Sequence, residues 1–178
     1  MLATEFNKFC LMWPAFVADR VDPKGRHRIR ANIPGLTKLS AWALPLTNGG
    51  GSAQRGSHIV PAKGAAIFVW FIGGDPDRPV YAAGWWGQPE AGSEVPGDAR
   101  DADHPEDVQV LELAKLRITV DERAGKEQCF IEDKVSGDHI QFDQVDQAMR
   151  IKATSQLVIE CDGEVQIVGT RIVINGRI

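Results

Sequence analysis

The residue types that could do chemistry in this chain are few, and none has the spacing that an enzyme requires. His58 follows Ser57 in a glycine-rich stretch, which would suit a base beside a nucleophile, but no matched acid or nucleophile turn accompanies them. Asp75 and Asp77 flank a proline in a turn, where carboxylates more often support the turn than hold a cation. Residues 49–56 lack the Gly-Lys-Ser/Thr ending of a phosphate loop. We therefore predict no catalytic site and no enzymatic activity.

Metal-ligating residue types are equally scattered. His104 and His139 have no ligand partners at the spacing of a metal site. The three cysteines, Cys10, Cys129 and Cys161, are too far apart to predict a disulfide framework or a CxxC site. We therefore predict three reduced thiols, no bound metal and no cofactor.

Composition narrows the class of protein further. The chain has 178 residues, of which 43% are hydrophobic and 25% charged, so we expect it to fold. Its formal net charge of −4 argues against a uniformly basic nucleic-acid binder. The longest apolar stretch, Ala65 to Ile72, is far short of the roughly 20 residues of a membrane helix. We expect no signal peptide, because no cationic start and apolar run open the chain.

The chain separates into two halves of different composition. All ten prolines lie at or before Pro105. Residues 1–90 hold ten Lys/Arg against six Asp/Glu, whereas residues 91–178 hold ten against eighteen. The stretch between the halves is rich in Pro, Gly and acids and lacks periodicity, as linkers do. We predict an N-terminal segment at 1–13, a first domain at 14–88, a linker at 89–107 and a second domain at 108–178.

The first half shows the pattern of a small β-barrel. Residues 25–33 alternate strictly, with one face formed by His27, Ile29, Ala31 and Ile33. Residues 40–46 form a second extended segment, in which Pro45 indicates an edge or a strand end. Residues 65–71 are apolar on both faces, and a Gly/Pro turn separates them from a returning strand at 80–86. Short strands with Gly/Pro turns predict an all-β domain, a five- or six-stranded barrel of OB type.

The second half reads as a series of short strands, each with one apolar face and no helix to cover it. A single ribbon cannot bury about fifteen inward side chains, and leaving them exposed would forfeit about 20–45 kcal/mol before entropy is counted. Open edges would also favour aggregation. We predict that identical chains intertwine into a threefold β-helix, although the arithmetic allows other closures. The expected trimer core is Leu116, Ile118, Val120, Ile131, Ile140, Phe142, Ile151, Leu157, Ile159, Val165, Ile167, Ile172 and Ile174.

Several motifs, in this order, resemble a known family. They are GRHRIRANIPG at 25–35, SAWALPL at 40–46, Val60-Pro61 with Gly64, and GDPDRPV at 74–80. Together they look like the OB-fold domain of contractile-tail phage spike proteins, the baseplate assembly protein V family, which is related to the VgrG proteins of type VI secretion. Segments such as Gly125-Lys126-Glu127 and Ile151-Lys152-Ala153 resemble the start of that family's three-stranded β-helix.

The resemblance implies a structural component of a contractile injection machine. A homotrimeric central spike would dock on the baseplate hub and pierce the host envelope, crossing the outer membrane transiently, when the sheath contracts. The protein would be made in the host cytoplasm and located in the tail baseplate of the virion. Some members carry a lysozyme domain, for which the linker leaves no room. Some end in an iron-binding His-x-His tip, which is absent here, so the resemblance implies a separate tip-capping protein.

The first domain also carries a cluster of basic and aromatic residues. In the spike interpretation the hub contacts are Arg26, Arg28, Arg30, Trp42, Trp85 and Trp86. An alternative is an OB-fold module that binds single-stranded nucleic acid, with the same arginines and with Trp70 among its stacking aromatics. We favour the hub, and expect no nucleic-acid partner, because the acidic second half and its apolar strands do not suit a nucleic-acid module.

Overall fold

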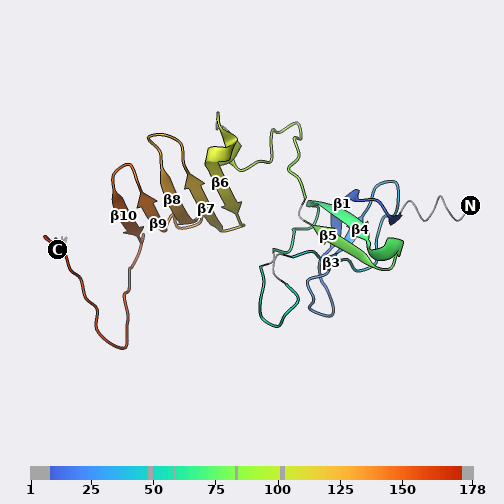
Figure 1. Cartoon of the computed structure of the whole chain (residues 1–178), viewed down its shortest axis with the longest axis horizontal. Coiled ribbons are helices and arrows are strands. Elements are labelled where there is room, and N and C mark those ends of the chain that lie inside the picture. Colours follow the sequence, from blue (N-terminus) through green and yellow to red (C-terminus); the bar gives the residue numbers. More distant parts are fainter. Residues whose placement is uncertain (1–8, 48–49, 58, 83, 101–102, 174–178) are drawn as a thin grey trace, which may run out of the picture. The chain divides into compact units, whose positions relative to one another are not determined.

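The chain forms two compact units, Met1–Val95 and Pro96–Ile178, which we call the first and second units. The computed structural model describes residues 9–47, 50–57, 59–82, 84–100 and 103–173. Its regular structure is almost all β, in two five-stranded sheets (Figure 1). The stretch predicted as a linker contains a short helix, α2 (Gly97–Arg100), and a 3₁₀ turn, η2 (Pro105–Asp107). Among the described residues, no helix is long and apolar enough to cross a membrane.

The first unit is built from five short strands. Their order in the sheet is β2-β1-β4-β5-β3, and every pairing is antiparallel except the parallel pair of β3 and β5. A 3₁₀ turn, η1 (Ile72–Gly74), connects β4 to the chain that enters β5. The strands are β1 (Trp13–Asp19), β2 (Arg30–Asn32), β3 (Leu44–Pro45), β4 (Ala66–Phe71) and β5 (Pro79–Ala82).

Hydrogen bonds between the segments that flank the two edge strands, β2 and β3, close this sheet into a barrel. Ile29 and Ala43 form a β-bridge, with N–H to oxygen distances of 3.2 and 2.8 Å in the two directions. The Ser40 amide also donates to the Ala31 carbonyl at 2.8 Å. The result is a five-stranded barrel, as the sequence pattern predicts. Pro45 is the last residue of β3, which confirms its prediction as a strand end.

The barrel core comes from residues that alternate along the strands. Ile29, Ala31 and Ile33 are fully buried, as predicted, together with Ile67 and Val69 of β4. The same face was expected to include His27, and this prediction is wrong. His27 is exposed and adopts a left-handed conformation with a φ of 56°. The Tyr81 hydroxyl donates to the His27 carbonyl at 2.9 Å, a contact from across the barrel that local alternation cannot reveal.

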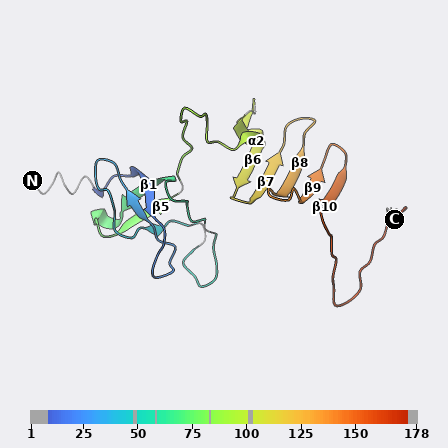
Figure 2. The same cartoon turned by 180° about the vertical axis from the view of Figure 1, so that it is seen from behind.

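The second unit contains one antiparallel meander in which each strand pairs with the next along the chain. Figures 1 and 2 show these strands side by side from both directions. The five strands pair within one chain, so the interlacing of chains predicted from residue 108 onward is not shown in this part and stays a prediction. The strands are β6 (Val108–Glu112), β7 (Leu116–Asp121), β8 (Gln128–Asp133), β9 (His139–Asp143) and β10 (Ala148–Lys152).

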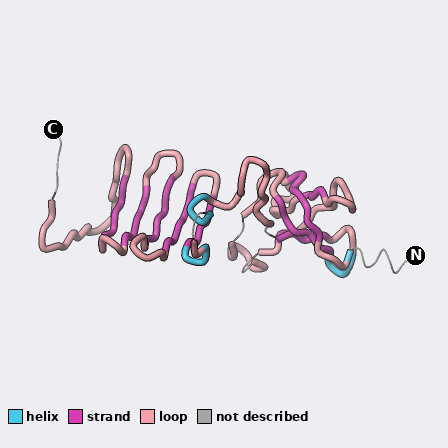
Figure 3. Tube along the Cα trace, turned by 90° about the horizontal axis from the view of Figure 1, so that it is seen from above, coloured by secondary structure: helices cyan, strands magenta, loops and turns pink. Residues whose placement is uncertain are grey.

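Beyond β10 the chain leaves the meander and forms no further strand in the described residues. Residues 153–173 run as an extended excursion, drawn as loop in Figure 3. The Asp138 carboxylate fixes its start, accepting hydrogen bonds from the backbone and hydroxyl of Thr154, both at 2.6 Å. From 155 to 173 every residue is exposed, and no hydrogen bond or ion pair joins this stretch to the described part of the chain.

Candidate assembly surfaces

A row of aliphatic side chains crosses all five strands of the second unit. In the strand register, Ile118 lies opposite both Leu111 and Ile131, and Ile140 lies opposite both Ile131 and Ile151. Directly opposed residues of a sheet project from the same face. These five residues therefore form one continuous aliphatic row.

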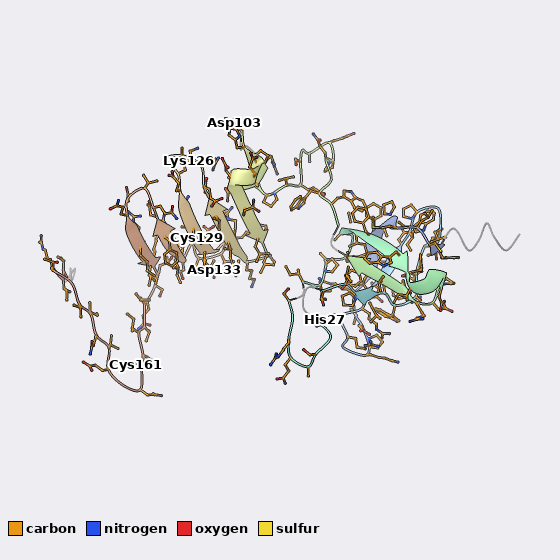
Figure 4. All side chains as sticks on the ribbon, in the orientation of Figure 1. His27, Asp103, Lys126, Cys129, Asp133 and Cys161 are labelled. Carbon is orange, nitrogen blue, oxygen red and sulfur yellow. The ribbon has the colours of Figure 1, made fainter. Side chains whose placement is uncertain are left out.

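A second row on the same face is also mostly apolar. It contains Val120, Cys129, Phe142 and Met149, with Gln109 at the β6 end. Figure 4 marks Cys129 within the sheet. Phe142 is 46% exposed and Met149 is 60% exposed, so this surface has no cover in the described chain. We call it the apolar face, and its members are Leu111, Leu116, Ile118, Val120, Cys129, Ile131, Ile140, Phe142, Met149 and Ile151.

The opposite face of the meander is polar. One of its rows runs Glu112, Arg117, Glu132, His139 and Lys152, with charges that alternate over the first three strands. The Arg117 guanidinium forms ion pairs with Glu132 at 2.7 Å and with Asp98 at 3.0 Å. In a sheet with one polar and one apolar face, the polar face is exposed to solvent and the apolar face is buried against another surface.

The structure brings together about half of the residues predicted for the trimer core. Seven lie on the apolar face: Leu116, Ile118, Val120, Ile131, Ile140, Phe142 and Ile151. Five lie in the exposed excursion after β10: Leu157, Ile159, Val165, Ile167 and Ile172. Ile174 lies outside the described residues.

Sequence reasoning missed two members of the apolar face, Leu111 and Met149. Met149 stands two residues before Ile151, so strict alternation would have found it. Leu111 is harder to assign, because Val108 and Val110 suggest the opposite face of β6. Val108 is in fact buried, at 3% exposure, on the polar side of the sheet.

Two of the predicted hub arginines form a cluster with a tryptophan on the first unit. The guanidinium carbons of Arg28 and Arg30 lie 5.5 and 5.8 Å from the centre of the Trp42 ring, within cation–π range. Arg30 Nε also donates to the Ser40 carbonyl at 2.9 Å. Arg26 is exposed, and its backbone amide donates to Asp22 at 2.8 Å. Arg28, Arg30 and Trp42 make up what we call the Arg–Trp cluster.

The predicted residue Trp85 belongs to a separate group of aromatic rings on the first unit. Its ring centre lies 4.9 Å from that of Phe68 and 6.1 Å from that of Phe16. Phe16 and Trp85 are both exposed, and the neighbouring Trp86 is exposed over 62% of its surface. We call Phe16, Phe68, Trp85 and Trp86 the aromatic patch. Sequence reasoning missed Phe16 and Phe68 because they lie on different strands, β1 and β4. The alternation along one strand does not show which aromatic rings of other segments contact it.

Asp22 holds the loop that carries the arginines. Its carboxylate accepts hydrogen bonds from Arg28 Nε and Nη2 at 3.0 and 2.6 Å and from the amides of Lys24, Arg26 and Arg28. The hydrogen bond from the Arg28 guanidinium is the main cause that holds the pKa of Asp22 well below its usual value, and the backbone amides add to it. The stabilisation is therefore complete above the unfolded pKa of about 4 and is lost as the pH falls below it.

We expect Asp22→Asn to destabilise the first unit at neutral pH and to flatten its acid dependence. The amide cannot form the ion pair with Arg28, and it presents one acceptor oxygen where the carboxylate presents two. Urea denaturation at pH 7 and pH 3 measures both effects. Asp77→Asn, in an exposed turn, is the control and should keep the wild-type acid dependence. An unchanged pH profile for Asp22→Asn would contradict the assignment.

Within the described residues, no group of three or more His, Cys, Asp or Glu side chains is placed to hold a metal ion. Residues 13–86 match the family model of the type VI secretion system/phage-baseplate injector OB domain. The match spans the barrel from β1 to β5 and ends before the second unit. No curated protein matches the chain.

The match to the injector OB domain confirms the sequence interpretation at a coarse level. This domain is a structural part of phage baseplates and injectors. It indicates a structural role in injection machinery, in assembly with other baseplate components, and a location in the tail baseplate. The aromatic patch and the Arg–Trp cluster both lie within the residues that match this family model.

Proposed function

We propose that the protein is the homotrimeric central spike of a contractile injection machine. Its injector OB domain docks on the baseplate hub, and its second unit forms the shaft that pierces the host envelope on sheath contraction. A separate tip-capping protein and, transiently, the host outer membrane are its other partners. The observation that carries this proposal is the uncovered apolar face of the meander.

Packing of three apolar faces around a threefold axis would cover them all at once. Each copy contributes ten residues to the face, and burying a large apolar side chain is worth about 1.5–3 kcal/mol. The polar faces would then point outward into water. A three-sided shaft of this kind explains why the strands pair within one chain while the sheet still lacks a core of its own.

The excursion after β10 supports the same assembly. It is rich in Val and Ile, yet residues 155–173 form no hydrogen bond within the described chain. Once other copies cover this stretch, its backbone amides and carbonyls need hydrogen-bond partners. Strands from two other copies would supply them, so we propose that the chains intertwine here, beyond the three-sided part.

The first unit has two surfaces suited to the hub. The aromatic patch offers exposed rings of the kind that anchor protein interfaces. The Arg–Trp cluster is a separate set of residues and offers guanidinium groups to the same partner. Arg28 is already paired with Asp22 and Arg30 with a carbonyl, so both are held in fixed positions. Fixed cations and rings suit docking to a preformed protein surface.

The test is the mass of the purified chain in solution, measured by light scattering. We expect three times 19.5 kDa, and a species that resists SDS until boiled. A monomer would contradict the spike. Binding of a single-stranded oligonucleotide that weakens steeply with salt would then favour the nucleic-acid alternative.

A further inference from the structure

A pocket of about 520 Å³ opens on the polar face of the second unit. Thr119 of β7 and Phe130 of β8 lie directly opposite each other and line it together. Arg117 lines it from further along β7, and Asp98 of α2 lines another side. Lys126 belongs to the turn between β7 and β8, which Figure 4 shows at one end of the strands.

Two polar atoms at this pocket have no hydrogen-bond partner within the described chain. One is Oγ1 of Thr119, a residue that is only 7% exposed. The other is Nε of Arg117, whose Nη atoms are engaged by Asp98 and Glu132. Buried polar groups in folded proteins are nearly always paired, so the pair of unused donors points to an oxygen atom supplied by a ligand.

The charges around the pocket decide the class of ligand. Three basic and five acidic side chains line it, which disfavours an anion. The carboxylates are in turn committed: Asp121 is bound by Arg123, and Asp143 and Asp146 by Arg150. No trio of metal ligands exists among the described residues, which leaves a neutral ligand that both donates and accepts hydrogen bonds.

We propose that this pocket binds a ring of a neutral saccharide. Its hydroxyl oxygens would accept from Thr119 Oγ1 and Arg117 Nε, and a hydroxyl proton would reach the carboxylate of Glu127, the acidic lining residue that no arginine of the described residues binds. Its C–H face would lie on the Phe130 ring. The volume falls within the range of small-molecule sites. The pocket is on the polar face, so the proposed trimer leaves it open, although the inference does not need the trimer.

The experiment titrates the full-length protein with three neutral disaccharides, maltose, lactose and diacetylchitobiose, by calorimetry, with inorganic phosphate as the anionic comparison. We expect saturable binding of at least one disaccharide and none of phosphate. Thr119→Val keeps the shape of the side chain and removes the hydroxyl, and should weaken binding about tenfold. Thr47→Val, in the first unit and outside the pocket, should bind like the wild type.

Amide NMR shifts of the wild-type protein give a second measurement that does not depend on any variant. With the binding disaccharide added, the shifts should concentrate on β7, β8 and the turn that joins them. Absence of binding to all three disaccharides, preferential binding of phosphate, or full affinity in a folded Thr119→Val protein would each overturn the proposal. Light scattering reports the trimer separately, so failure here is distinct from failure of the spike.

Discussion

Replacing Ile131 by aspartate is expected to reduce the trimer to single chains. Ile131 lies on β8, the central strand, and is flanked on the apolar face by Ile118 and Ile140. Three copies would place three carboxylates inside the proposed core, each with a desolvation cost of several kcal/mol. Three aliphatic contributions of about 1.5–3 kcal/mol would be lost as well. Light scattering should show one third of the wild-type mass, and the SDS-resistant band should disappear.

Val135→Asp is the matched control for this substitution. It makes the same change from an aliphatic side chain to a carboxylate, at a residue that is 75% exposed in the turn between β8 and β9. Because the turn is not part of the apolar face, this variant should stay trimeric. If Ile131→Asp kept the full mass and the resistance to SDS, the apolar face would not be the interface between copies.

The barrel was largely predictable from sequence because its determinants are local. Ile29, Ala31 and Ile33 alternate along the chain, and alternation selects the buried face of a strand directly. Pro45 marks a strand end because it lacks the amide that would continue the ladder. His27 was misplaced because Asp22 binds the backbone amides of its neighbours Arg26 and Arg28, and Tyr81 binds its own carbonyl, and local alternation reveals none of these contacts.

In the second unit, by contrast, the sequence predicted the apolar face but not the pairing of the strands. Period-two alternation correctly placed seven residues on one face, since a face follows from the pleat alone. It does not say which strand lies beside which, so interlaced chains and a single-chain meander were both compatible with the pattern. The saccharide pocket lay beyond prediction for the same reason. Thr119 meets Phe130 only through the register of β7 and β8.

Gly84→Ala is expected to destabilise the first unit strongly while the trimer persists. Gly84 follows β5 and lies close to the backbone of Ala66, the first residue of β4. A side-chain carbon on Gly84 would overlap the Ala66 carbonyl oxygen, a backbone atom that cannot rotate away. We expect a loss of about 3 kcal/mol in the unfolding free energy of this unit, near the upper end for single substitutions. Because Trp85 follows Gly84 directly, its fluorescence should change as its packing on Phe68 loosens.

Gly97→Ala serves as the control, since a carbon on Gly97 would meet no atom within 4 Å and the residue is not left-handed. Its denaturation curve should match the wild type, and a wild-type curve for Gly84→Ala would contradict the predicted clash. The two large-effect variants also test each other. Ile131→Asp should abolish the trimer and keep the unfolding transition of the barrel, whereas Gly84→Ala should weaken that transition and keep the three-chain mass. These opposite results require that the barrel folds through its own contacts, whereas the sheet of the second unit is stabilised by other copies. A spike needs both properties, because its first unit docks on the hub and its second unit forms the shaft.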